Sequence, residues 1–146
     1  MNQEGKYFIT TPIYYINDRH HIGHAYTTIA ADVFARHYRL KGRDVYFLTG
    51  TDENSQKNIE AAKKYFQKDE LSREEIKKYL DEMAAIWSNT WKELNLTNDD
   101  FIRTTEERHI EAVRAFFKRV WDKGDIYKGL YEGFYCEGCE AFVKRY

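Results

Sequence analysis

Two histidines, His21 and His24, are the residues of this sequence best suited to chemistry on a charged ligand. They follow the apolar run 7–11 and precede a helical pattern that begins at Ala25. A strand that leads through a turn into a helix places side chains at a helix N-terminus, where free N–H groups and the helix dipole favour anions. Gly23 allows close approach to the backbone. Imidazoles one helical turn apart can both bond phosphate oxygens, although such a pair can also be a plain helix start with surface histidines.

The elements that must position this pair form a βαβ pattern. Residues 7–13 are apolar and β-branched, which predicts a buried strand ending near Pro12, and residues 44–49 predict a second strand ending at Gly50. Residues 25–41 between them predict a helix that Gly42 stops. A crossover of this length implies parallel strands and a right-handed connection. The apolar side expected for this helix consists of Ile29, Val33, Ala35 and Leu40.

The rest of the chain predicts helices followed by short strands. Residues 54–68 predict a polar amphipathic helix, and Ser72 with Glu75 forms a capping box for a helix that runs to about Leu94. Residues 99–103 are a short extended piece, and residues 126–143, rich in Gly and aromatics, predict antiparallel strands around a turn. A helix capped by Thr105 should bury Ile110, Val113, Phe116, Phe117, Val120 and Trp121.

Length and composition bound the class of protein. A chain of 146 residues is long enough for one domain with a core and too short for two full ones. The net charge of −1 gives no overall electrostatic attraction for nucleic acid. No run approaches a membrane span, no secretory h-region opens the chain, and the two cysteines fit a reducing compartment, so we expect a cytoplasmic protein with no membrane partner.

Several segments together closely resemble methionyl-tRNA synthetase, a class I aminoacyl-tRNA synthetase. The likeness runs along nearly all of the chain. The segments that carry it are Pro12–Asn17, His21–Thr28, Leu48–Glu53, Asp100–Thr105, Lys123–Tyr127 and Tyr135–Glu140.

The resemblance implies an enzyme that activates methionine with ATP and Mg²⁺ to methionyl-adenylate and then transfers the methionyl group to tRNA. His21 and His24 match the HIGH signature, whose histidines contact the ATP phosphates and steady the transition state, so they are the catalytic candidates. The resemblance also places Tyr14, Asn17 and Gly23 on the ATP side of the site.

The methionine side of the site is implied by three further matches. Ile13 and Tyr15 match positions that hold the methionine backbone and cover its side chain, and a thioether suits an aromatic wall. Asp52 matches the carboxylate that pairs with the substrate ammonium. Two alternatives stay open: Tyr15 can be a core or turn aromatic, and Asp52 can cap the next helix.

The sequence departs from the family pattern at two places. Asn54-Ser55 stands where the family usually has His-Gly, so the ATP side of the pocket keeps hydrogen-bonding groups but loses an imidazole and a flexible glycine. His20 stands where Pro is usual, and it should loosen the turn that Pro would stiffen.

A Cys-x-x-Cys pair, Cys136 and Cys139, is half of a zinc knuckle. Tetrahedral zinc needs four ligands, commonly from two such pairs, and no second pair exists in this sequence. Zn²⁺ is therefore an expected ligand only as half a site, and the alternative is a reducible thiol pair.

The fold class expected is α/β: the amino-terminal half of a class I Rossmann-like nucleotide-binding fold in residues 1–118, followed by the start of an inserted, β-rich connective module in residues 119–146. The family's Lys-Met-Ser-Lys-Ser loop is absent, so we expect an amino-terminal fragment that is a poor enzyme alone. The expected partners are methionine, ATP, initiator and elongator methionine tRNA in the complete enzyme, and a carboxy-terminal half.

Two other functions remain open. One is a non-catalytic nucleotide- or methionine-binding fragment or paralogue that acts through a partner. The other is a nucleotidylyltransferase of the same superfamily, against which residues 12–15 and 49–53 argue.

Overall fold

The computed structural model describes residues 5–136 and 138–143, and the chain forms two compact units, Met1–Glu111 and Ala112–Tyr146. The first unit contains the predicted βαβ pattern. The second contains most of the last helix and a small hairpin. The expected boundary at residue 118 between a catalytic and a connective part stays a prediction.

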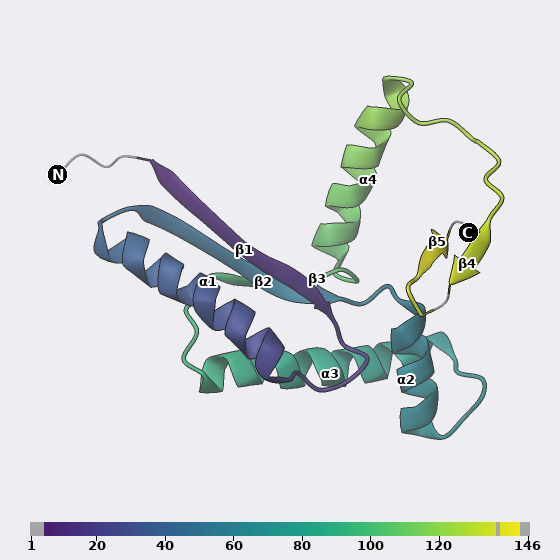
Figure 1. Ribbon diagram of the computed structural model, residues 1–146, viewed down its shortest axis with the longest axis horizontal. Helices are drawn as coiled ribbons and strands as arrows, with labels where there is room; N and C mark the ends of the chain where they lie inside the picture. Colours follow the sequence, from purple (N-terminus) through teal and green to yellow (C-terminus); the bar gives the residue numbers. More distant parts are fainter. Residues whose placement is uncertain (1–4, 137, 144–146) are drawn as a thin grey trace. The chain divides into compact units, whose positions relative to one another are not determined.

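The first unit is built on a parallel three-stranded sheet in the order β1-β2-β3 (Figure 1). Strands β1 (Lys6–Tyr15) and β2 (Asp44–Asp52) are joined by helix α1 (Ile22–Leu40), and β3 (Asp100–Arg103) adds to the other side of β2. The α/β fold and the parallel βαβ unit are thus confirmed. The β1–β2 register shifts between Thr10 and Ile13, on either side of the segment that contains Pro12, which has no N–H to donate to a ladder.

Two helices connect β2 to β3. Helix α2 (Gln56–Phe66) and helix α3 (Arg73–Glu93) correspond to the predicted helices. The predicted capping box is confirmed, because Ser72 Oγ accepts from Glu75 N at 3.2 Å and Glu75 Oε2 accepts from Ser72 N at 2.9 Å. The main core lies where α3 meets the end of β1; its buried members are Tyr14, Ile16, Ala62, Tyr79, Leu80, Met83, Ala84, Trp87 and Trp91.

Burial of β1 and α1 differs from the prediction. Only Thr11 and Tyr14 of β1 are buried, because β1 is the edge strand of the described sheet. Helix α1 contacts the sheet mainly through small residues, and Ile29, Val33 and Leu40 of its predicted apolar side are exposed. The buried residues of α1 are Thr28, Ala31, Asp32 and Ala35, so only the last was predicted correctly. Gly42, at φ +75°, lies just after the helix end, as predicted.

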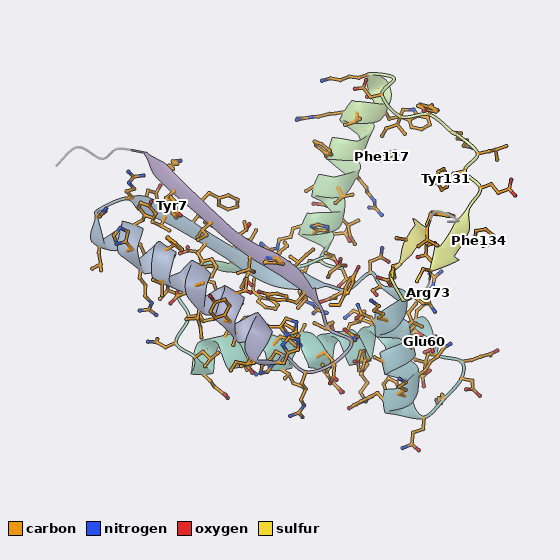
Figure 2. All side chains as sticks on the ribbon, in the orientation of Figure 1. Tyr7, Glu60, Arg73, Phe117, Tyr131 and Phe134 are labelled. Atoms are coloured by element: carbon orange, nitrogen blue, oxygen red, sulfur yellow. The ribbon has the colours of Figure 1, made fainter. Side chains whose placement is uncertain are left out.

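The second unit contains the predicted antiparallel strands. Strand β4 (Phe134–Cys136) pairs with β5 (Ala141–Val143) in the register Phe134↔Val143 to Cys136↔Ala141. Helix α4 (Glu107–Asp122) has no buried residue, so its predicted buried side is wrong for the described chain. Phe117 and Tyr131, both labelled in Figure 2, are 51% and 75% exposed. Among the described residues, no helix is both long and apolar enough to cross a membrane.

Candidate functional site

The two signature histidines build the start of α1 together. His21 is the N-cap, and its Nδ1 accepts from Gly23 N at 3.1 Å, while His24 Nδ1 accepts from His21 N at 3.1 Å. The two rings stack with centroids 3.8 Å apart. Because both Nδ1 atoms act as acceptors, the proton of each neutral imidazole is on Nε2. The pair therefore offers two N–H donors at a helix N-terminus, where anions are favoured.

The surroundings of His24 favour its uncharged form, which can still donate from Nε2. Burial lowers the pKa of His24 below its ordinary value, and the neighbouring His21 and His20 lower it further. His24 is therefore neutral at pH 7. Gly23 is needed for the arrangement, because a Cβ there would lie 2.9 Å from Cε1 of His21.

A polar cavity of about 390 Å³ lies beside the pair. Most of its lining comes from the loop between β1 and α1, and the lining residues are Tyr15, Asn17, Asp18, Arg19, His21 and His24. Four of these were predicted as site residues. Asp18 and Arg19 were missed, although a cation in the loop directly before the histidine pair is a visible signal for a phosphate ligand.

Four residues predicted for the ATP and methionine sites, Tyr14, Ile13, Gly23 and Asp52, lie outside this lining. Tyr14 is buried behind the pair: its ring is 4.9 Å from His24 and its hydroxyl hydrogen-bonds Thr28 Oγ1 at 3.1 Å. Ile13 is 41% exposed on β1, and Gly23 acts through the backbone geometry given above. Tyr14 thus supports His24 from the core side.

Asp52 and Tyr15 end adjacent parallel strands and are register partners. The Asp52 carboxylate accepts from Asn54 N at 3.1 Å, and its carbonyl oxygen accepts from Asn58 Nδ2 at 3.0 Å. The alternative that Asp52 caps the next helix is wrong, because Ser55 is the N-cap of α2. Of the two residues that depart from the family pattern, Ser55 therefore caps α2 and Asn54 holds the Asp52 side chain through its backbone N–H.

Glu53, the residue after Asp52, is the centre of a buried network that the sequence analysis missed. Its side chain has no exposed surface and accepts from Arg103 Nε at 2.6 Å and Thr51 Oγ1 at 2.9 Å. Thr105 also donates to it, so the hydroxyl predicted to cap α4 bonds Glu53 instead. The hydrogen bond to Glu53 raises the pKa of Arg103, although its burial opposes this. Since parallel strands end at one edge, a Glu and an Arg at the ends of β2 and β3 could have indicated this pair.

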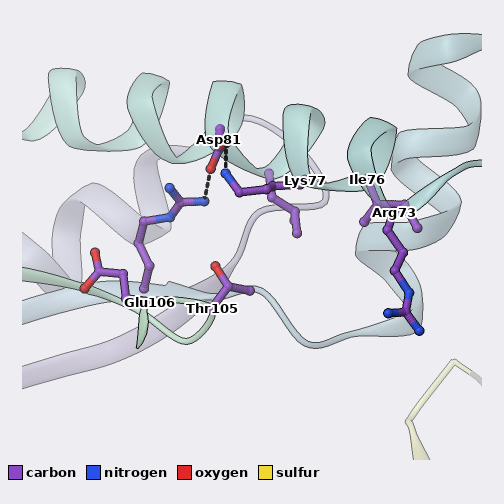
Figure 3. Close-up of a pocket in the computed structure, with 8 residues that line it drawn as sticks. Arg73, Ile76, Lys77, Asp81, Thr105 and Glu106 are labelled. Carbon is purple, nitrogen blue, oxygen red and sulfur yellow. Dashed lines mark hydrogen bonds and ion pairs between the residues drawn. The ribbon is translucent and has the colours of Figure 1, made fainter. Parts of the chain in front are cut away.

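A second cavity, of about 400 Å³, lies between α3 and the end of β3 (Figure 3). Ile76 and Leu80 form its apolar part. Asp81 pairs with two of its three lining cations, with Lys77 at 2.5 Å and with Arg103 at 2.7 Å. With its central charges already paired, this cavity carries no chemistry comparable to that of the histidine cavity.

Cys136 and Cys139 lie close together in the second unit, where Cys139 N donates to Cys136 Sγ at 3.4 Å. Two thiolates supply half of a tetrahedral zinc shell. Within residues 5–136 and 138–143, no group of three or more His, Cys, Asp or Glu side chains is arranged to hold a metal ion. The described residues therefore do not form a complete zinc site.

A parallel βαβ unit with a polar cavity at the strand ends and a helix N-terminus beside it is a Rossmann-type nucleotide-binding arrangement. Residues 7–146 match the family profile described as "tRNA synthetases class I (M)". The chain belongs to the methionyl-tRNA synthetase family of class I.

Curated relatives and solved structures agree with this assignment. The chain is 49% identical to methionine–tRNA ligase of Thermotoga maritima over 94% of its own length and 51% identical to that of Campylobacter jejuni over 92%. It covers 21% and 20% of those two proteins, and so spans about a fifth of their length. Methionyl-tRNA synthetase of Mycobacterium tuberculosis in complex with methionyl-adenylate superposes with a TM-score of 0.84 at 37% identity, covering 94% of this chain and 26% of that one.

Proposed function

We propose that this chain provides the phosphate- and methionine-binding part of a methionine–tRNA ligase, which activates methionine with ATP and transfers it to tRNA. The observation that carries the proposal is the pair of Nε2 donors on His21 and His24 in one cavity with Tyr15, whose register partner is Asp52. A homologous structure contains methionyl-adenylate, the product of the first step.

The phosphate side of the site stabilises charge. The methionine carboxylate attacks the α-phosphorus of ATP, a bond to the α-phosphorus forms, and pyrophosphate leaves with the electrons of the broken P–O bond. His21 and His24 donate N–H bonds to phosphate oxygens as charge shifts onto them, with the α1 N-terminus and the Arg19 guanidinium nearby. Asn17, which lines the same cavity, binds ATP beside the two histidines. The Mg²⁺ that accompanies ATP is part of the substrate.

The amino-acid side orients methionine. Asp52, held by Asn54, binds the ammonium group, and the Tyr15 ring covers the thioether. Ile13 shapes the methionine backbone site from β1. Because the reaction depends on bringing the carboxylate into line with the α-phosphorus, fixed strand ends contribute chiefly by orientation.

The complete reaction requires further parts in our proposal. A carboxy-terminal half would supply positive charge for the leaving pyrophosphate, initiator and elongator methionine tRNA would accept the methionyl group, and the cytoplasm, where translation takes place, is the expected compartment. Cys136 and Cys139 are proposed as half of a zinc site in the connective module. No catalytic step is assigned to zinc.

One observation favours the second candidate, a non-catalytic binding fragment that acts through a partner. Strand β1 and helix α1 each expose large apolar side chains, among them Phe8 at 63%, Tyr26 at 77% and Val33 at 58%. Exposed apolar surface on this scale is typical of an interaction site. The two candidates share the ligand-binding residues and differ in whether chemistry follows.

Methionine-dependent ATP–pyrophosphate exchange tests the proposal. We expect weak exchange or none by the chain alone, and exchange once a carboxy-terminal half from a relative is added. His24→Ala should lower the restored rate by 10²-fold or more, the scale of losing one charge-stabilising donor. His37→Ala, an exposed histidine on the same helix, is the matched control and should leave it unchanged.

The outcomes separate the candidates. ATP and methionine binding without exchange in the presence of the second half supports the binding fragment. Exchange that is insensitive to His24→Ala contradicts the assigned role of the pair.

A further inference from the structure

His20 directly precedes the histidine pair but does not line the pair's cavity. It is absent from the lining of the polar cavity that contains His21 and His24. Its ring centroid is instead 5.6 Å from those of both Trp87 and Trp91 of α3. The sequence predicts a turn loosened by His20, whereas these ring contacts favour a turn that His20 anchors.

Two buried polar atoms of this ring cluster have no hydrogen-bond partner among the described residues: Nδ1 of His20 and Nε1 of Trp91. Trp91 is 1% exposed, so its N–H is shielded from bulk solvent. An indole N–H can only donate, and an unprotonated imidazole nitrogen can accept. Buried polar groups are nearly always paired, and these two are complementary.

We propose that one buried water links Trp91 Nε1–H to His20 Nδ1, and that this link makes His20 a positioning residue for the His21–His24 pair. In this link Nδ1 of His20 is the acceptor. The role in ligand binding rests on the proposed function, whereas the link itself does not.

The surrounding contacts explain how the link acts on the site. Trp87 donates from Nε1 to the carbonyl oxygen of Asp18 at 3.2 Å, and its ring lies 4.8 Å from that of His24. Trp87 therefore holds the loop at Asp18 and the first turn of α1, while the Trp91 link holds the residue directly before the N-cap. Without the link, the loop is fixed on one side only and the His21 backbone N–H, which bonds His24 Nδ1, is free to shift.

Nuclear magnetic resonance on the ¹⁵N-labelled chain tests the link. The chain has three tryptophans, so the indole N–H signals are few and can be assigned by Trp→Phe substitution. In His20→Leu we expect the Trp91 indole signal to shift and its hydrogen exchange to accelerate roughly tenfold. His20→Asn places an amide oxygen near the position of Nδ1, and it should retain the signal and the protection. An unchanged Trp91 signal in His20→Leu would overturn the link.

The positioning role has a readout of its own, the His24 imidazole resonances. These resonances should shift in His20→Leu and in Trp91→Phe, and they should keep their original positions in His20→Asn. The double variant His20→Leu/Trp91→Phe should show no larger shift than either single variant, because both substitutions remove the same link. His24 resonances that stay unchanged when the Trp91 signal moves would overturn the positioning role.

ATP titration separates this inference from the proposed function. We expect a several-fold weaker affinity for ATP in His20→Leu than in His20→Asn. Equal ATP affinities in these two variants would overturn the positioning role. If the unsubstituted chain binds no ATP, the proposed function fails while the two resonance readouts still decide the inference. Thermal melting of each variant by circular dichroism confirms that it is folded.

Discussion

Helices α3 and α4 have similar amphipathic patterns and opposite surroundings. Both place aromatic residues at helical spacing, yet α3 buries six residues and α4 buries none. The buried residues of α3 are Tyr79, Leu80, Met83, Ala84, Trp87 and Trp91. An apolar stripe thus indicates which side of a helix can be covered, while a partner segment decides whether it is.

The partner of α3 is the loop that leads into the histidine pair. Tyr79 donates its hydroxyl to the carbonyl oxygen of Ile16 at 3.1 Å, and Trp87 donates to that of Asp18. Burial, with a contribution from Asp18, raises the pKa of Tyr79 to about 12, so its phenol stays a donor at neutral pH. In α4 the aromatic contact is internal, with Phe117 and Trp121 stacked at 6.1 Å. Helix α3 is therefore part of the site's support.

The largest difference between the two helices is expected from Trp87→Ala against Trp121→Ala. Trp87 has no exposed surface, so truncation leaves a cavity and should lower the free energy of unfolding by about 3–5 kcal/mol. Trp121 is 49% exposed, and its truncation should cost under about 1 kcal/mol. Urea unfolding followed by circular dichroism measures both. Equal losses would show that α4 is covered in solution.

Two glycines allow a second comparison, between the packed β2–β3 pair and the open segment around Gly129. A Cβ at Gly50 of β2 would lie 2.0 Å from the carbonyl oxygen of Ile102 in β3, so Gly50→Ala must separate the strands. We expect a loss of about 2–3 kcal/mol in unfolding free energy. At Gly129 the nearest atom, Cε2 of Tyr127, is at an ordinary 3.7 Å, and Gly129→Ala should be close to neutral. A neutral Gly50→Ala would contradict the close β2–β3 approach.

The sequence was sufficient for the elements of the fold and insufficient for their burial. Period, turn residues and caps are local properties, so the βαβ unit, the Ser72 cap and the hairpin were predicted correctly. Burial depends on which element lies opposite. An edge strand such as β1 and a helix such as α4 can match the pattern of buried elements without a cover, and no local feature of the sequence shows the difference.

The site shows the same division. The resemblance marked His21, His24, Tyr15 and Asn17, and the structure brings these four into one cavity. The Glu53–Arg103 pair was not predicted because it joins residues 50 positions apart in the sequence. The packing of His20 on α3 was not predicted for the same reason, since the residues involved are even further apart. Support of this kind comes from tertiary contacts that spacing does not reveal.

A smaller difference in the pH dependence of stability is expected between two ion-paired carboxylates, Asp32 in α1 and Asp122 in α4. Burial of Asp32 in α1 opposes its charge, but hydrogen bonds from Arg36 and Thr97 outweigh this and set its pKa below the ordinary value. A lowered folded-state pKa stabilises the fold above the unfolded-state value, and this contribution disappears as pH falls through the folded-state pKa. Asp32→Asn should therefore flatten the acid side of a plot of unfolding free energy against pH.

Asp122 of α4 is the control for this prediction. It pairs with Lys118 at 2.6 Å, but its side chain is 56% exposed, and Asp122→Asn should leave the pH plot unchanged because solvent screens such pairs. If both variants flatten the plot equally, the hydrogen bonds from Thr97 to Asp32 are not what makes the folded state sensitive to acid.

The smallest effect is expected where α4 is most open. Phe116 is 72% exposed, so Phe116→Gln removes apolar surface that is already in contact with water and should change the unfolding free energy by no more than about 0.5 kcal/mol. Unfolding curves at several protein concentrations test whether another copy of the chain covers this face of α4. If Phe116→Gln costs more than about 1.5 kcal/mol, and the cost grows with protein concentration, a second copy covers the face of α4 and stabilises it by mass action. A small change that is independent of concentration leaves α3 as the only one of the two helices whose aromatic residues stabilise the fold.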